Sequence, residues 1–125
     1  MTETSQKNIL IIEDDEFFRE LISKKLISNG FNVSEAVDGK KGIDKVKELK
    51  PDLVLLDLLL PDVDGFTVLS KMKEDAEISK IPVIVLSNLD SKEDVEKVLK
   101  LGASDFLIKS RFDLDEIIIK IKSCL

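Results

Sequence analysis

The sequence predicts an α/β fold in which one sheet of five parallel strands carries helices on both faces. Apolar runs of strand length recur five times, and each is followed by a longer segment with helical periodicity. The first, third and fourth runs are almost continuously apolar, as strands buried on both faces of a parallel sheet are. Regular alternation with short connections gives a doubly wound α/β sandwich. The expected strands are residues 8–12, 31–36, 53–57, 82–87 and 105–109.

A glycine and a proline delimit the first two strand–helix units. After the strand at 8–12, an apolar helical face predicts a helix that ends near Gly30, where a left-handed C-cap is expected. The strand at 31–36 alternates more than the others, as an edge strand does, and Pro51 helps to end the helix that follows it. The two helical faces are Phe18, Leu21, Ile22 and Leu26, and then Ile43, Val46 and Leu49.

Polar residues at N-cap positions mark the starts of the last three helices. Asp64, Ser91 and Asp113 each stand where a helix N-cap is expected, and Gly102 stands where the fourth helix ends. Apolar residues recur at helical spacing behind these caps. The three faces are Phe66, Leu69 and Met72, then Val95, Val98 and Leu99, and then Leu114, Ile117, Ile118 and Ile121.

Length and composition exclude several classes of function. The 125 residues predict a single domain, 1–125, with an ordered core at about 7–124. A net charge of −6 without a long basic stripe argues against direct binding to nucleic acid. The absence of histidine excludes a His-based triad and an imidazole zinc site, and the single Cys124 cannot form an internal disulfide. No apolar run reaches membrane-spanning length and the polar start is no signal peptide, so we expect a cytoplasmic protein without a membrane partner.

Polar residues gather at the edge of the sheet where function is expected. In open α/β sheets the functional crevice lies beyond the carboxyl ends of the strands. A cluster of carboxylates there is costly unless a cation occupies it, and oxygen-only ligands suit Mg²⁺. The backbone carbonyl of Leu59, just past the third strand, can add a ligand. The residues that converge on this edge are Glu13, Asp14, Asp15, Asp57, Ser87, Asn88 and Lys109.

Each of these residues also has an ordinary structural interpretation. The acids at 13–15 suit a helix N-terminus that includes an N-cap. Lys109 can be a solvated lysine, Ser87 a strand-end hydroxyl and Phe106 a core residue. The conjunction of the acids with Asp57 and Lys109 favours a functional site over these interpretations.

Together the residues resemble the receiver domain of bacterial two-component response regulators, over nearly the whole chain. The acidic "EDD" after the first strand, Asp57 within "LVLLDLLLPDVDG", and Lys109 fall in the order and spacing of that family. The resemblance implies strand order 2-1-3-4-5, a flavodoxin-like sandwich. It also implies a signalling protein that is no enzyme beyond its own phosphorylation and slow dephosphorylation. The other matching positions are Pro61, Gly65, Ser87 and Phe106.

The resemblance implies a role for each site residue. Asp57 would accept a phosphoryl group, whose oxygens Ser87 and Lys109 would contact. Ser87 and Phe106 would form the switch between the two signalling states. The resemblance implies Mg²⁺ as the cofactor, held by Glu13, Asp14, Asp57 and the backbone carbonyl of Leu59.

The implied partners are other signalling proteins. The phosphoryl donor would be a sensor histidine kinase or a histidine phosphotransfer protein, because this chain has no histidine. Phosphorylation would change the surface of the fourth helix, fifth strand and fifth helix, toward an unknown downstream protein. The chain would be a monomer or a dimer that forms on phosphorylation. The start "MTETSQ" favours a stand-alone regulator over a receiver excised from a longer protein.

Two local features add expectations of their own. The family usually places proline, often with a cis peptide bond, where Ser110 follows Lys109 here. Either the bond is trans and the loop differs, or the bond is cis at a cost of about 2.5–4 kcal/mol. Leu59 and Leu89, two positions beyond Asp57 and Ser87, are apolar and predict slow self-dephosphorylation.

Other interpretations of the chain are weaker. "DVDGFT" at 62–67 superficially matches the start of a haloacid-dehalogenase-type phosphatase, but Pro61 precedes it and the strand has ended at Asp57. A flavodoxin-like electron carrier needs a phosphate-cradling loop where this chain has three acids. A scaffold of the receiver fold that acts without phosphorylation stays an alternative.

Overall fold

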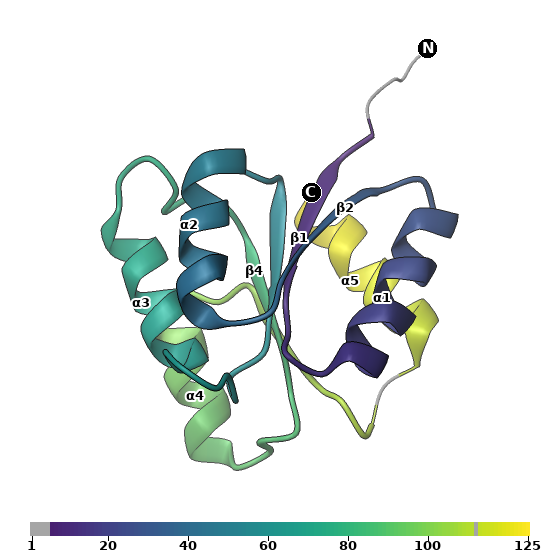
Figure 1. The fold of residues 1–125 in the computed structure, drawn as a ribbon. Helices are drawn as coiled ribbons and strands as arrows, with labels where there is room; N and C mark the ends of the chain where they lie inside the picture. Colours follow the sequence, from purple (N-terminus) through teal and green to yellow (C-terminus); the bar gives the residue numbers. More distant parts are fainter. Residues whose placement is uncertain (1–5, 112) are drawn as a thin grey trace.

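A five-stranded parallel sheet forms the centre of the computed structural model, which describes residues 6–111 and 113–125 (Figure 1). The strand order is β2-β1-β3-β4-β5, as the resemblance implied. Every predicted strand is present, to within one residue at either end: β1 (Asn8–Ile12), β2 (Asn32–Ala36), β3 (Leu53–Leu56), β4 (Val83–Ser87) and β5 (Asp105–Ile108). The helices are α1 (Glu16–Ser28), α2 (Gly39–Leu49), α3 (Gly65–Glu74), α4 (Lys92–Lys100) and α5 (Leu114–Cys124).

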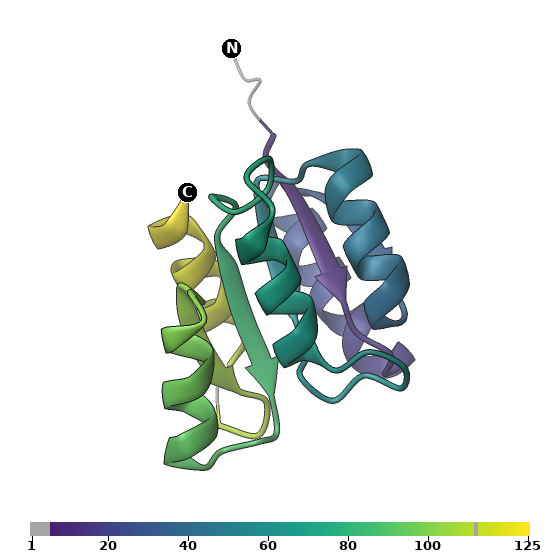
Figure 2. The same cartoon turned by 90° about the vertical axis from the view of Figure 1, so that its left-hand side faces the viewer.

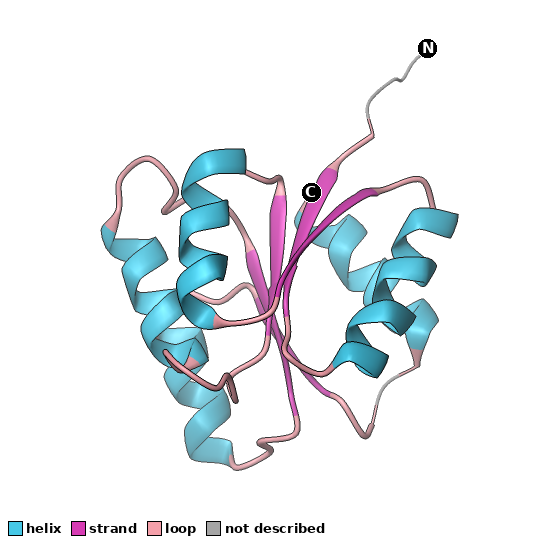
Figure 3. Ribbon diagram, viewed as in Figure 1, coloured by secondary structure: helices cyan, strands magenta, loops and turns pink. Residues whose placement is uncertain are grey.

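The helices form a layer on each face of the sheet. α1 and α5 cover one face, and α2, α3 and α4 cover the other (Figures 1 and 3). Turned by 90°, the second layer shows α2, α3 and α4 side by side over the strands (Figure 2). No helix in the described part of the chain is long and apolar enough to cross a membrane. The doubly wound sandwich that the sequence predicts is confirmed.

Each face of the sheet has its own hydrophobic core. Leu10 and Ile12 of β1 pack in the cluster that includes residues of α2, α3 and α4. Ile9 and Ile11 of the same strand pack in the cluster that includes residues of α1 and α5. Successive strand residues point to opposite faces, so a strand covered on both sides must be apolar at every position. This explains the continuous apolar runs in the sequence.

The predicted caps begin and end the helices. The side chains of Asp64, Ser91 and Asp113 each accept a hydrogen bond from the backbone N–H three residues on, as N-caps do. Gly30 and Gly102 have φ angles of +88° and +108°, the left-handed conformation expected after a helix. Because all five strands are parallel, their carboxyl ends lie at one edge of the sheet. The polar residues that end or follow β1, β3, β4 and β5 lie at this edge.

Three leucines expected on buried helical faces are partly exposed. Leu21, Leu49 and Leu99 are 37%, 46% and 46% exposed. Their neighbours Ile22 and Val98 are fully buried, so these leucines lie at the margins of the apolar stripes rather than at their centres.

Candidate functional site

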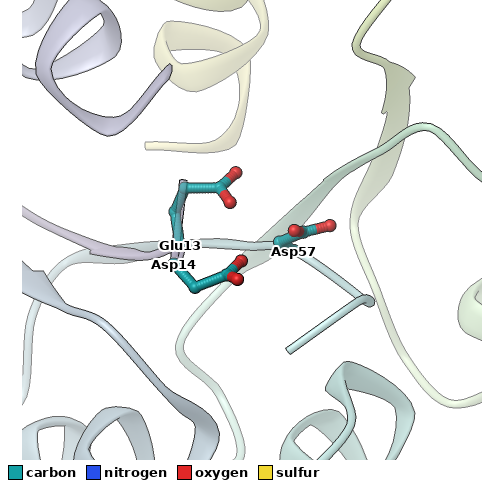
Figure 4. A group of neighbouring side chains, drawn as sticks. All are labelled: Glu13, Asp14 and Asp57. Carbon is teal, nitrogen blue, oxygen red and sulfur yellow. The ribbon is translucent and has the colours of Figure 1, made fainter. Parts of the chain in front are cut away.

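Three carboxylates meet at the carboxyl ends of β1 and β3. These strands are neighbours, with Ile12 opposite Leu56, so the next residues, Glu13 and Asp57, leave the sheet side by side. Carboxylate oxygens of Glu13, Asp14 and Asp57 all lie within 4.8 Å of one another (Figure 4). Glu13 and Asp57 are only 3% and 5% exposed, whereas Asp14 is exposed. The structure thus brings together the acids that the sequence singled out.

The backbone at this edge is held by sheet hydrogen bonds and by a close helix. The N–H of Glu13 donates to the carbonyl of Ala36, and that of Asp57 donates to the carbonyl of Ile12, both at 3.0 Å. A Cβ atom at Gly65 would lie 2.4 Å from the carbonyl oxygen of Asp57, well inside contact distance. The start of α3 therefore packs directly on the backbone of the central aspartate, which explains the glycine eight residues beyond it.

Lys109 places its ammonium among the carboxylates. It forms an ion pair with Glu13 Oε1, and its Nζ lies 3.3 Å from Asp57 Oδ2. Its Nζ also lies 4.5 Å from the centroid of the Phe18 ring, a cation–π contact. No peptide bond among the described residues is cis, so the Lys109–Ser110 bond is trans. The lysine reaches the acids without the cis bond that the sequence left open.

The pKa values of Glu13 and Lys109 are both raised, for different reasons. Burial, with a further contribution from the charge of Asp57, raises the pKa of Glu13 to about 7, although its hydrogen bond to Lys109 opposes the shift. Burial lowers the pKa of Lys109, but the adjacent Glu13 and Asp57 outweigh that effect and hold the pKa of Lys109 above its usual value. The ammonium thus stays charged and compensates part of the negative charge.

The remaining predicted residues lie around the cluster. Ser87 is the last residue of β4 and fully buried, and its Oγ accepts a hydrogen bond from the N–H of Leu89 at 3.3 Å. Phe106 of β5 is partly buried and packs on the core beneath α2, α3 and α4. Leu59 is 55% exposed, and its N–H donates to Asp57 Oδ1 at 3.3 Å. Asp15 has the structural role considered for it: it is the N-cap of α1.

Arg19 was not anticipated from the sequence. Its Nη1 donates to the backbone carbonyl oxygen of Glu13 at 2.9 Å, and its Nε donates to Glu35 Oε1 at 3.2 Å. An arginine on an amphipathic helix gives no local signal of such contacts, because Glu35 lies 16 residues away on another element.

Asp62 belongs to the segment that superficially matches a phosphatase motif, and the structure gives it a different role. Its two carboxylate oxygens accept the backbone N–H groups of Gly39 and Lys40, at 2.8 and 3.0 Å, at the start of α2. Desolvation raises the pKa of Asp62, but the donors of Lys40 and Gly39 outweigh it and leave the pKa below its usual value. Asp62 therefore ties the loop after β3 to α2, and Asp64 caps α3, so both aspartates of "DVDGFT" serve helix ends.

The chain is similar to response regulators in sequence and in structure. The profile of the response regulator receiver domain matches residues 9–122. The DNA-binding dual master transcriptional regulator RpaA of Synechocystis is 41% identical over 117 residues, which cover 94% of this chain and 48% of that protein. Chemotaxis protein CheY of Bacillus subtilis is 36% identical over 119 residues, covering 94% and 96%. The solved Mn²⁺-bound form of response regulator Rcp1 is 30% identical with a TM-score of 0.82, covering 94% and 92%.

These matches concern the part of the chain that holds the site. The chain spans about half the length of RpaA and nearly all of CheY. The matched range, 9–122, includes all the residues from Glu13 to Lys109 that form the acidic cluster and its lysine. The chain belongs to the response regulator receiver domain family.

Proposed function

We propose that this receiver domain accepts a phosphoryl group on Asp57 from a phosphohistidine donor. The observation that carries the proposal is a nearly buried carboxylate with an ammonium 3.3 Å away and two further carboxylates within 4.8 Å. Protein catalysis of phosphoryl transfer consists mostly of positioning and of compensating charge, and this cluster has groups for both. The aspartates of the rival phosphatase motif have helix-capping roles instead, which supports the proposal further.

The donor set of the cluster fits a hard divalent cation. Its oxygens belong to carboxylates, and one ammonium does not balance three acids. Glu13, Asp14 and Asp57, with the backbone carbonyl of Leu59, would hold Mg²⁺. When bound, Mg²⁺ would supply positive charge close to the acidic and phosphoryl oxygens. The relative Rcp1, solved in a Mn²⁺-bound form, supports a divalent cation site in this fold.

The chain's own residues provide the rest of the transfer. A carboxylate oxygen of Asp57 attacks phosphorus, an O–P bond forms, and the P–N bond to the donor histidine breaks with its electron pair returning to the imidazole nitrogen. Lys109 and the Ser87 hydroxyl bind phosphoryl oxygens in the product. Since the chain only transfers this group to itself and releases it slowly, we propose a signalling protein rather than an enzyme acting on a separate substrate.

Phosphorylation would change the surface formed by α4, β5 and α5, which a downstream protein would bind. Ser87 of β4 lies opposite Ile108 of β5, two residues along the strand from Phe106. A movement of Ser87 toward the phosphoryl group would therefore change the space available to the Phe106 side chain. We expect Phe106 to turn further inward and the surface to change shape. Free protein and protein bound to beryllofluoride should differ in amide chemical shifts over residues 87–111, and identical shifts would contradict the switch.

The proposed partners are a sensor histidine kinase or a histidine phosphotransfer protein, and a downstream protein that binds the α4, β5 and α5 surface. We propose a cytoplasmic chain that is monomeric or dimerises on phosphorylation. RpaA is described as DNA-binding, but this chain spans only 48% of it. With a net charge of −6, we propose no direct nucleic-acid binding by this domain.

Intact mass after incubation with acetyl phosphate and Mg²⁺ tests the central proposal. The parent should gain one phosphoryl group, and Asp57→Asn should gain none. An adduct on both proteins would place the acceptor elsewhere. If neither gains an adduct, with acetyl phosphate or with a histidine kinase, the phosphorylation-independent scaffold becomes the better function.

A further inference from the structure

The guanidinium of Arg19 holds the peptide group that joins two of the acids. The backbone carbonyl of Glu13 belongs to the planar unit between Glu13 and Asp14, and Arg19 Nη1 donates to its oxygen at 2.9 Å. This unit lies where the chain leaves β1 and turns into α1, so the sheet fixes only its N-terminal side, through the N–H of Glu13. The Glu13 carboxylate has further partners, the ammonium of Lys109 and the N–H of Asp15, which donates to Oε2 at 3.1 Å. Arg19 is thus the side chain that holds the backbone between the two acids.

Arg19 is itself held in place from a neighbouring strand. Its Nε donates to Glu35 Oε1 at 3.2 Å, and the hydroxyl of Ser23 donates to the other oxygen of Glu35 at 2.5 Å. Lys45 of α2 donates to the backbone carbonyl of Glu35. The side chain of Arg19 is only 12% exposed and Ser23 is 7% exposed. A planar guanidinium with two donors engaged in different directions is a rigid link from β2 to the end of β1.

We propose that Arg19 is a positioning residue for the metal site, acting through the Glu13–Asp14 peptide group. Outer contacts that orient metal ligands typically change metal affinity by 10- to 100-fold when they are removed. Without the Nη1 donor, the backbone between the two acids can shift, and the carboxylates of Glu13 and Asp14 lose their fixed positions relative to Asp57. This inference rests on the proposed function, because it assumes that Glu13, Asp14 and Asp57 hold Mg²⁺.

Electrostatics alone predicts that loss of Arg19 strengthens Mg²⁺ binding, the opposite of what lost positioning predicts. Arg19 is a cation near the acids, so its replacement by a neutral residue removes a charge that repels Mg²⁺ and also leaves Glu35 unpaired and negative. Both effects would strengthen Mg²⁺ binding. Weaker binding in an Arg19→Gln variant therefore indicates lost positioning rather than lost charge.

Titration calorimetry with MgCl₂ tests the inference on the parent and three variants. Arg19→Gln removes the link, and Arg19→Lys keeps the cation but not the two diverging donors. Lys25→Gln is the matched control, because Lys25 lies on the same helix and pairs with Asp115 at 2.6 Å, away from the acids. Thermal melting in chelator reports whether each variant is folded. The titrations are run at about pH 8, because Glu13, whose pKa is raised to about 7, is then mostly ionised.

We expect the Kd for Mg²⁺ to rise by about tenfold or more in Arg19→Gln, to rise also in Arg19→Lys, and to stay within about twofold of the parent in Lys25→Gln. If Arg19→Gln does not fold, Arg19→Lys carries the test. Unchanged or tighter binding in the Arg19 variants would overturn the positioning role while leaving the proposed function intact. Equal weakening in the Lys25 control would also overturn it, since the effect would then be a general loosening of α1. A parent that binds no Mg²⁺ would overturn both this inference and the proposed metal site.

Discussion

At the scale of single residues, Lys109 contacts two of the carboxylates that would hold the proposed cation. The ammonium forms an ion pair with Glu13 and lies 3.3 Å from Asp57, so it compensates the acids in the metal-free protein. Phe18 supports it from the other side through its ring. The same lysine is thus a counter-ion before phosphorylation and, in our proposal, a phosphoryl ligand after it.

Replacing this lysine should therefore tighten Mg²⁺ binding. In Lys109→Met the competing cation is gone, and we expect the Kd for Mg²⁺ to fall by about tenfold, equivalent to about 1.4 kcal/mol. Titration calorimetry measures it, with Lys25→Met as the control for loss of a lysine. Weaker binding in Lys109→Met would show that the lysine helps to build the site rather than compete for it.

The perturbed pKa of Glu13 predicts how metal-free stability depends on pH. Burial raises this pKa from 4.5 to about 7, so the folded state favours the protonated acid. The resulting contribution to stability is complete below about pH 4.5 and is lost as the pH rises through about 7. In chelator, the melting temperature of the parent should therefore fall relative to that of Glu13→Gln between these pH values. A difference that is constant with pH would contradict the raised pKa.

At the scale of elements, the start of α3 is fitted to the backbone that carries Asp57. Gly65 lies at the contact, where a Cβ would come 2.4 Å from the Asp57 carbonyl oxygen. The adjoining loop is fixed at its other side by Asp62, which accepts two N–H groups of α2. The loop after β3 is thus anchored to two helices.

A methyl group at position 65 should disturb the site as well as the fold. We expect Gly65→Ala to cost about 2 kcal/mol, as overpacking against a fixed backbone does, and to slow phosphorylation by acetyl phosphate several-fold. Gly30→Ala is the matched control: it is strained by its φ of +88° but meets no atom within 4 Å. Both variants should melt earlier, measured by circular dichroism, and only Gly65→Ala should be phosphorylated more slowly. If Gly65→Ala and Gly30→Ala were phosphorylated at equal rates, the packing of α3 on this backbone would have no role in the function of Asp57.

The loops after β3 and β4 should control the lifetime of the phosphorylated state. Leu59 and Leu89 are apolar at positions close to Asp57 and Ser87, and can shield an acyl phosphate from water. We expect Leu59→Asn and Leu89→Glu each to speed dephosphorylation, by roughly tenfold or about 1.4 kcal/mol of barrier. Mass spectrometry after removal of the donor gives the decay rates. Leu49→Asn is the control, because this leucine is similarly exposed but lies at the end of α2, and an equal effect there would contradict shielding.

At the scale of the whole molecule, the sequence predicts the elements better than it predicts the contacts between them. Periodicity, caps and apolar runs give each strand and helix, because these signals are local. The carboxylate cluster is predicted too, since parallel strands end at one edge. The roles of Arg19 and Asp62 are missed because their partners, Glu35 and the start of α2, are distant in the sequence and leave no local pattern.

The two cores share one sheet, so we expect the domain to unfold as a single cooperative unit. Guanidinium unfolding followed by circular dichroism and by methyl NMR signals from each core should give coincident transitions. Addition of Mg²⁺ should shift both transitions together by mass action. If the α1 and α5 side melted separately from the α2, α3 and α4 side, the single-domain proposal would be wrong.

The lysine among the acids has a consequence for how a cell would use this protein. If the proposed function holds, the resting chain carries its own competitor for the cofactor, bound within the site at a fixed ratio of one to one. An internal competitor raises the apparent Kd for Mg²⁺, so a higher free concentration of cellular magnesium would be needed before half of the molecules are ready to receive a signal.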